Sequence, residues 1–190
     1  MTIFETIEAA LKLKLTGVSL EDVTPPGQAK KYKDVPVIFA APEEEFKESQ
    51  YPCFVVSMYD MRYAPERVYM EPIYAEKSAT ELKKMNYCQP YDIYYQIAAY
   101  SVYNSHDRGL HLGLMKKLRH LDFLSIIEND IALDLTLRYD SYSAQDITGA
   151  KKVFKKVWNY VVEASINDVE YQTVQKVLTY DVQLDQKSGG

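Results

Sequence analysis

The sequence predicts an α+β domain, in which an N-terminal helix and a central helix pack against a mixed and mainly antiparallel sheet. Apolar residues recur at helical spacing in only two segments of the chain. Several other segments alternate between apolar and polar residues with a period of two, which is typical of half-buried strands. The expected order is one helix, two strands, a long irregular segment, one strand, one helix and three strands, and this order favours α+β over a parallel α/β fold.

The first helix is predicted near the start of the chain, where apolar residues are spaced three and four apart over residues 3–11. Thr2 and Glu5 form a capping-box pattern that marks the start of this helix, and Gly17 is expected to end it. Residues 21–34 contain a Pro-Pro-Gly sequence and three lysines, and they predict an exposed loop.

Two short strands are predicted at residues 35–40 and 51–59, joined by an acidic, solvated connection at 43–48. Residues 62–90 then show no clear period, apart from a possible helical turn at 79–85. We interpret 62–90 as a long loop or an extended hairpin arm, inserted in a single α+β domain that spans 1–190. Loops of this length in a compact domain are usually functional or disordered.

The second half of the chain carries the clearest strand signal, because tyrosines and isoleucines alternate with other residues over 91–103. A leucine stripe at 110–121 predicts the central helix, with Asn104 or Ser105 as its cap. The polar residues 186–190 are expected to form a flexible tail. Three further strands are predicted at 133–139, 154–166 and 174–184.

The strand at 154–166 is apolar on both faces, with Trp158 on one face and Val157 and Val161 on the other. Both faces of the sheet must therefore be covered. We expect the two helices to cover one face and another element, such as a second subunit, to cover the other.

Composition excludes several classes of function. The chain has 190 residues and a net charge of −5, with a pI of about 5.3, which argues against a nucleic-acid binder or a protein that docks on anionic membrane. Cys53 and Cys88 are too few for a disulfide framework, so a reducing compartment is expected. Neither a secretory signal nor an apolar run long enough to span a membrane is recognisable, so no membrane association is expected.

Tyrosine is the most unusual feature of the composition, with 17 copies. Its large ring and polar tip suit surfaces that are wet in the free protein and dry when docked. The arm and the strand that follows it are therefore candidate interfaces. The candidate interface residues are Tyr63, Tyr69, Tyr74, Tyr87, Tyr91, Tyr94 and Tyr100.

The three histidines offer the best place to search for a catalytic or metal site. His106, Asp107 and His111 lie near the start of the central helix, but a spacing of five does not place two ligands on one helical face. Helix capping and surface polarity explain them better, although a small metal-dependent hydrolase remains an alternative. Phosphate-binding and nucleophile-elbow glycine motifs are missing. We therefore expect no enzymatic activity, no catalytic residue, no metal and no cofactor, and we expect Cys53 to be a buried structural thiol.

Two parts of the sequence resemble a known family. These are VPVIFAAPEEEF at 35–46 with YPCFVVSMYDMRYAPERVY at 51–69, and PYDIYYQIAAYSVYNSHDRGLHLGLMKKL at 90–118. They resemble the neck and tail-terminator (tail-completion) proteins of tailed bacteriophages, in which a strand of this character runs into a helix that packs on a mixed sheet.

The resemblance implies a structural virion protein of the tail or neck, assembled in the host cytoplasm. It implies a homo-oligomeric ring, commonly of six copies, that caps the tail tube and joins it to the head. The implied partners are the tail tube protein and the head-completion or connector proteins, and DNA would pass through an axial channel without specific binding. An acidic chain suits such a channel, because a basic wall would hold the DNA. A generic peptide-binding assembly module is the other alternative to an enzyme.

Overall fold

A computed structural model of the chain describes residues 2–22, 27–40, 50–68, 73–76, 78–85, 89–128, 131–148, 152–166 and 172–175. The elements in chain order are α1 (Ile3–Leu15), β1 (Ser19–Glu21), β2 (Tyr32–Asp34), β3 (Val37–Phe39), β4 (Cys53–Tyr63), the 3₁₀ turn η2 (Pro65–Arg67), β5 (Ile73–Glu76), β6 (Glu81–Met85), β7 (Gln89–Ser101), α2 (Asn104–Lys117), β8 (Leu121–Glu128), β9 (Ile131–Thr148), β10 (Lys152–Ile166) and β11 (Gln172–Gln175).

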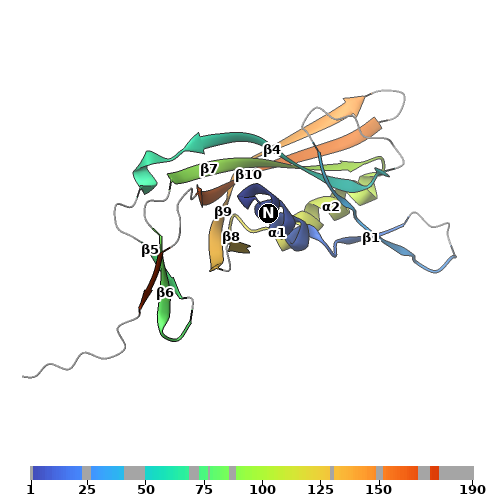
Figure 1. Cartoon of the computed structure of the whole chain (residues 1–190). Coiled ribbons are helices and arrows are strands. Elements are labelled where there is room, and N and C mark those ends of the chain that lie inside the picture. Colours follow the sequence, from blue (N-terminus) through green and yellow to red (C-terminus); the bar gives the residue numbers. More distant parts are fainter. Residues whose placement is uncertain are drawn as a thin grey trace, which may run out of the picture.

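Six strands form one large curled sheet in the order β3-β4-β7-β10-β9-β8. Every neighbouring pair is antiparallel except β3 and β4, which are parallel. The register shifts between Met58 and Asp60 in β4, and again between β9 and β10, where Asp140 of β9 is the extra residue. Such bulges bend a strand and increase its twist, and Figure 1 shows the resulting curvature, with both helices on the same side of the sheet. The predicted α+β architecture is confirmed.

Helix α1 begins as its sequence predicts. The hydroxyl of Thr2 accepts a hydrogen bond from the backbone N–H of Glu5, and the Glu5 carboxylate accepts one from the N–H of Thr2 at 2.7 Å. Ile3, Ile7, Leu11 and Leu15 form its buried face. No helix in the described part of the chain is long and apolar enough to cross a membrane.

The main core lies between the helices and the inner face of the sheet. It joins apolar residues of α1 and α2 to inward-facing residues of the central strands. On β7, Ile93, Tyr95, Ile97 and Ala99 belong to this core, as the alternation predicted. On β10, Trp158 is buried in it at 4% exposure, so the predicted facing of this strand is confirmed as well.

The outer face of the sheet carries a second, smaller cluster made of Cys53, Val55, Ala98 and Val157. Val157 is 2% exposed and Val161, on the same face of β10, is 0% exposed. Both faces of the strand are therefore covered at these two positions, as expected, but the single chain buries them and no second subunit is needed there. Cys53 is buried in this cluster, as expected.

Several boundaries differ from the sequence prediction. The central helix α2 begins at Asn104, within two residues of the predicted start, but its N-cap is Tyr103 rather than Asn104 or Ser105, and no side chain caps it. Leu121 was expected to end this helix but begins β8, a strand that the sequence did not predict. The strand predicted at 133–139 is part of the much longer β9. Its length follows from pairing with β8 at one end and with β10 over most of its residues.

The predicted loop at 21–34 holds a small antiparallel pair in its described residues, formed by β1 and β2. The N–H of Val35 also donates to the carbonyl of Val18 at 2.8 Å. This pair lies against α2, where Gly109 and Gly113 leave room for Leu20 and Val18.

The irregular segment 62–90 contains an antiparallel hairpin of β5 and β6, which agrees with the hairpin-arm interpretation. Residues 79–85 were expected to include a helical turn, but β6 occupies most of them, because Glu81–Met85 pair with β5 and with β11. Strand β11 overlaps the strand predicted at 174–184 only at residues 174 and 175. Residues 176–184 lie outside the described residues, as do residues 43–48, Cys88 and residues 186–190. The three strands form a sheet in the order β11-β6-β5, and Figure 1 places it beyond the ends of β4 and β7.

Candidate functional site

The base of the arm belongs to the large sheet. Arg62 and Tyr63 still pair with Asp92 and Tyr91 across β4 and β7, and the N–H of Ala64 donates to the carbonyl of Pro90 at 3.0 Å. Just beyond, Arg67 forms an ion pair with Asp92 in which both side chains are largely buried. A charge-assisted bond at this point fixes where the chain leaves the sheet, so the arm starts from a defined position.

The candidate tyrosines lie in three different places. Tyr63 is exposed at the end of β4, and its ring meets Tyr91 edge-on at 5.7 Å. Tyr94 lies on the outer face, 5.9 Å from Tyr59, with the guanidinium of Arg62 at 4.7 Å above its ring. These rings form two separate pairs at the arm end of the sheet, Tyr63 with Tyr91 on the core face and Tyr59 with Tyr94 on the outer face.

The remaining tyrosines are separate from these two pairs. Tyr100 is stacked on Tyr51 at 5.7 Å at the opposite end of β7, beside the cluster that contains Cys53. Tyr74 is exposed on β5 of the arm. Tyr69 and Tyr87 lie outside the described residues. The described candidates thus mark the arm, its base and the far end of β7, rather than a single patch.

The residues His106, Asp107 and His111 do not converge on one point. His106 Nε2 lies 3.0 Å from the carbonyl oxygen of Glu21, and its ring meets Tyr103 edge-on. Asp107 Oδ2 accepts a hydrogen bond from Lys156 at 2.6 Å. Among the described residues, no group of three or more histidines, cysteines and acidic residues is placed to hold a metal ion.

Surface polarity was nevertheless the wrong interpretation of His106 and Asp107. They are 6% and 5% exposed, because the start of α2 packs against β1 on one side and β10 on the other. Their partners come from Glu21 and Lys156, which are distant in sequence. Both residues therefore connect elements of the fold, and local spacing carried no sign of this.

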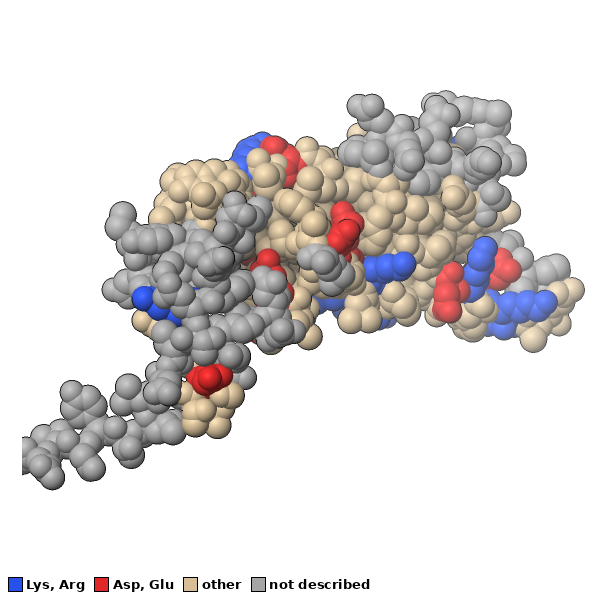
Figure 2. Space-filling view, in the orientation of Figure 1, with Lys and Arg blue, Asp and Glu red and all other residues tan. Residues whose placement is uncertain are grey.

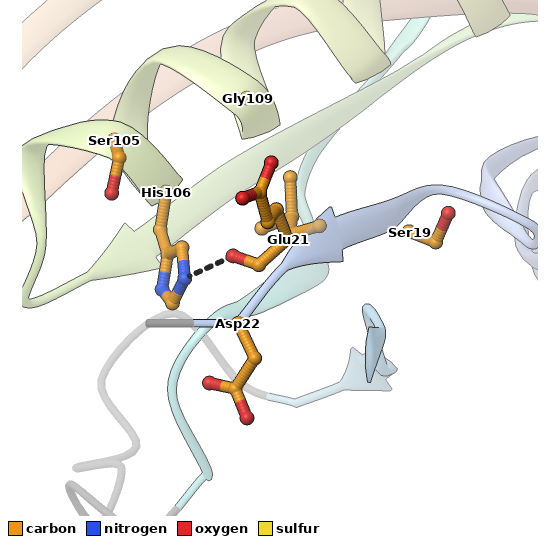
Figure 3. Close-up of a pocket in the computed structure, with 7 residues that line it drawn as sticks. Ser19, Glu21, Asp22, Ser105, His106 and Gly109 are labelled. Atoms are coloured by element: carbon orange, nitrogen blue, oxygen red, sulfur yellow. Dashed lines mark hydrogen bonds between the residues drawn. The ribbon is translucent and has the colours of Figure 1, made fainter. Parts of the chain in front are cut away.

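A cavity of about 540 Å³ opens beside His106, between β1 and the first turns of α2. Figure 3 shows the histidine bonded to the backbone of Glu21, with the Asp22 side chain pointing away from the helix. The carboxylate of Glu21 forms an ion pair with Lys30 at 2.9 Å. The imidazole is thus held by a backbone carbonyl, and the Glu21 carboxylate is already paired with a lysine.

A second cavity, of about 370 Å³, is lined mainly by rings from α2, β9 and β10. Trp158 and Tyr142 lie 5.3 Å apart, and His111 is within 5.9 Å of both. Burial lowers the pKa of His111, with a further contribution from the positive charge of Lys156. Burial raises the pKa of Tyr160 to about 12. The aromatic lining suits an apolar or aromatic group, and Arg119, which also lines the cavity, adds a positive charge.

The chain was compared with known families and curated proteins. No protein-family model matches it, and no curated protein matches it. What the chain does must therefore be inferred from its own fold and side chains.

Exposed apolar side chains on β8 form a surface that the sequence prediction missed. Leu121, Phe123 and Ile127 are 58%, 54% and 68% exposed on an edge strand of the large sheet. The sequence signal is the apolar run LDFLSII, but this run begins at Leu121, the last residue of the segment that predicts a helix. Charged side chains, by contrast, are dispersed, and on the described part of the face in Figure 2 positive and negative groups lie next to one another.

Proposed function

We propose that this chain is a structural subunit of the head–tail junction of a tailed bacteriophage, a tail-terminator or neck protein without catalytic activity. In this role copies form a ring that caps the tail tube, joins it to the head and leaves an axial channel for DNA. The proposal rests on the residue patterns given above and on where those residues lie in the fold.

The arm is the observation that carries the proposal. Strands β5, β6 and β11 pair with one another and, within the described chain, with no strand of the large sheet. The arm is anchored at its base by Arg67 and Asp92 and carries the exposed Tyr74. An anchored projection with an exposed aromatic ring is suited to contacting a neighbouring subunit, since aromatic anchors contribute strongly to association.

The two parts of the sequence that resemble the family are also neighbours in space. Residues 35–46 and 51–69 supply β3 and β4, and residues 90–118 supply β7 and α2. Strands β3, β4 and β7 are adjacent in the sheet, and α2 packs on the core beneath them. The resemblance is thus concentrated in one continuous unit of the fold.

Charge supports the role of the channel. The net charge of −5 and the mixed charges in Figure 2 provide no broad basic surface on the described part of that face. DNA would be able to slide past such a surface, because few phosphate contacts would form and few counterions would be released.

The proposal is tested by the assembly state and location of the protein. Light scattering and electron microscopy of the purified protein should reveal closed rings with a central opening, alone or on purified tail tubes. Antibody labelling of virions should place the protein at the head end of the tail. A protein that stays monomeric with tail tubes and is missing from that position would overturn the proposal.

A further inference from the structure

Strand β8 has an open hydrogen-bonding side. Within the described chain it pairs with β9 alone. The N–H of Tyr139 donates to the carbonyl of His120 at 2.8 Å, which makes these two residues a hydrogen-bonded pair of the ladder. Because the pattern alternates along an antiparallel strand, Asp122, Leu124 and Ile126 also direct their backbone groups to β9. The backbone groups of Leu121, Phe123, Ser125 and Ile127 therefore point outward.

The side chains of this strand are apolar on both faces. Leu124 and Ile126 are buried in the main core. Leu121, Phe123 and Ile127 lie on the other face and are more than half exposed. Edge strands are usually protected by charged side chains or proline. On β8 the Asp122 carboxylate accepts a bond from the N–H of Phe123 at 2.9 Å and forms an ion pair with Lys14 of α1 at 2.7 Å, while no charged side chain stands at Leu121, Phe123 or Ile127.

We propose that β8 pairs in antiparallel fashion with β8 of a second copy of this chain, with Leu124 at the two-fold axis. In this register Leu121 lies opposite Ile127 of the second copy, and Phe123 lies opposite Ser125. Each outward backbone group from Leu121 to Ile127 then gains a partner. The Phe123 amide exchanges its bond to Asp122 for a bond across the new ladder.

Charge distinguishes this register from the alternative in which the two-fold axis passes through Ser125. A two-fold axis at Ser125 would set Asp122 opposite Glu128 of the second copy, and like charges directly opposite one another are destabilising. An axis at Leu124 instead sets the exposed His120 opposite Glu128. Within the described part of the chain, one oxygen of the Glu128 carboxylate is buried without a hydrogen-bond partner, so a facing imidazole could donate a hydrogen bond to it.

A second copy suits this edge because the strand is complementary to itself. The outward apolar residues Leu121 and Ile127 are equidistant from Leu124, so a two-fold axis at Leu124 places Leu121 of each copy opposite Ile127 of the other. A contact between identical patches closes on itself. The pairing therefore goes beyond the proposed ring, which needs head-to-tail contacts, and it would join copies two at a time.

Lysine substitution at the open edge tests the pairing. Phe123→Lys with Ile127→Lys adds two charges to exposed positions, and Leu13→Lys with Leu112→Lys adds the same charge to exposed positions on the helices. Sedimentation should be measured over roughly 10–300 µM, because a one-strand interface is small. The unchanged chain and the helix variant should dimerise with concentration, and the β8 variant should stay monomeric with an unchanged thermal melt.

Two outcomes of that measurement would overturn the proposal: an unchanged chain that is monomeric over the whole range, or equal dimerisation of both lysine variants. Ring formation on tail tubes should survive the β8 lysines. Loss of pairing can therefore be distinguished from failure of the proposed ring.

Disulfide formation tests the register, in a Cys88→Ser background in which Cys53 is buried. Leu121→Cys with Ile127→Cys places thiols on directly opposite residues, which are about 5 Å apart at Cβ and close to disulfide reach. Oxidation should give a covalent dimer on a non-reducing gel. Phe123→Cys with Ile127→Cys should give none, and a dimer from this second variant alone would overturn the Leu124 axis.

Discussion

Lys156 on β10 reaches across to Asp107 on α2, and its Nζ lies 2.6 Å from Oδ2 of the carboxylate. The Asp107 side chain is 7% exposed and that of Lys156 is 21% exposed. The pair ties the second helix to the central strand of the sheet. An ion pair this buried adds little net stability, but removing one partner leaves an uncompensated charge in the interior.

Lys156→Met should therefore lower the free energy of unfolding by about 3–5 kcal/mol, measured by urea denaturation at pH 7. The double variant Lys156→Met with Asp107→Leu should recover most of that loss, because no buried charge remains. Lys30→Ala removes an exposed pair with Glu21 and should leave the urea midpoint unchanged. A small effect of Lys156→Met would show that water reaches Asp107.

Trp158→Ala should lower the free energy of unfolding by about 3–5 kcal/mol, since it empties a large buried site. Trp158 belongs to the main core and packs on Tyr142 and His111. Leu112→Ala, at an exposed position of α2, is the matched control. A loss of less than about 1 kcal/mol for the tryptophan variant would contradict the facing of β10.

Gly113→Ala should destabilise the chain more than Gly109→Ala, although alanine favours a helix by up to about 1 kcal/mol. A Cβ at Gly113 would lie 2.6 Å from Cγ1 of Val18, and a Cβ at Gly109 would lie 2.5 Å from Cδ2 of Leu20. Valine is branched at Cβ and cannot turn aside easily, whereas the end of a leucine can. Thermal melts of both variants decide the order, and equal melting temperatures would mean that β1 moves freely.

Cys53 should resist thiol reagents at pH 8 until the chain unfolds. Burial raises the pKa of its thiol to about 12, and the thiolate is the reactive form. In a Cys88→Ser variant, the labelling rate should rise with urea in parallel with unfolding.

Between the ordinary thiol pKa of about 8.5 and the raised value, the unfolded chain binds fewer protons than the folded one, so the free energy of unfolding should fall as the pH rises. Fast labelling of the folded chain would contradict this burial.

Tyr74→Ala should leave the stability of the isolated chain unchanged and impair assembly, if the arm contacts a neighbouring subunit as proposed. Tyr74 is exposed on β5, so its loss removes little buried area. The readouts are a urea melt and ring formation on tail tubes. Tyr32→Ala, at an exposed position on β2, is the control. Normal assembly of the Tyr74 variant would show that the Tyr74 side chain does not contact a neighbouring subunit.

Elements with a strong local period could be predicted from the sequence. Helix α1 has both an apolar stripe and the Thr2–Glu5 capping box, and β7 alternates without interruption from Ile93 to Ala99. Strand β8 was missed for the opposite reason. Its outward residues are apolar as well, so Phe123 and Leu124 show no contrast between faces, and periodicity cannot distinguish such a run from a helix.

The roles of the polar residues in the first turn of α2 could not be predicted locally. His106 and Asp107 look like surface residues in the sequence, yet their partners lie 85 and 49 residues away. Only the packing of α2 against β1 and β10 brings these groups together. The tyrosine content predicts an interface, which stays a prediction. It could not show which rings pair, because the contact of Tyr59 with Tyr94 depends on the register shift between Met58 and Asp60.

The third strand of the arm sets the order in which the fold can be completed. Gln172 of β11 pairs with Lys84 of β6, and α2, β8, β9 and β10 all lie between them in the chain. During synthesis the β5–β6 hairpin leaves the ribosome first and must wait for the whole large sheet before its partner strand arrives. A two-stranded hairpin alone is only marginally stable in water. The three-stranded sheet of the arm is therefore expected to be completed last, so any contact that the arm makes would form only after the large sheet has folded.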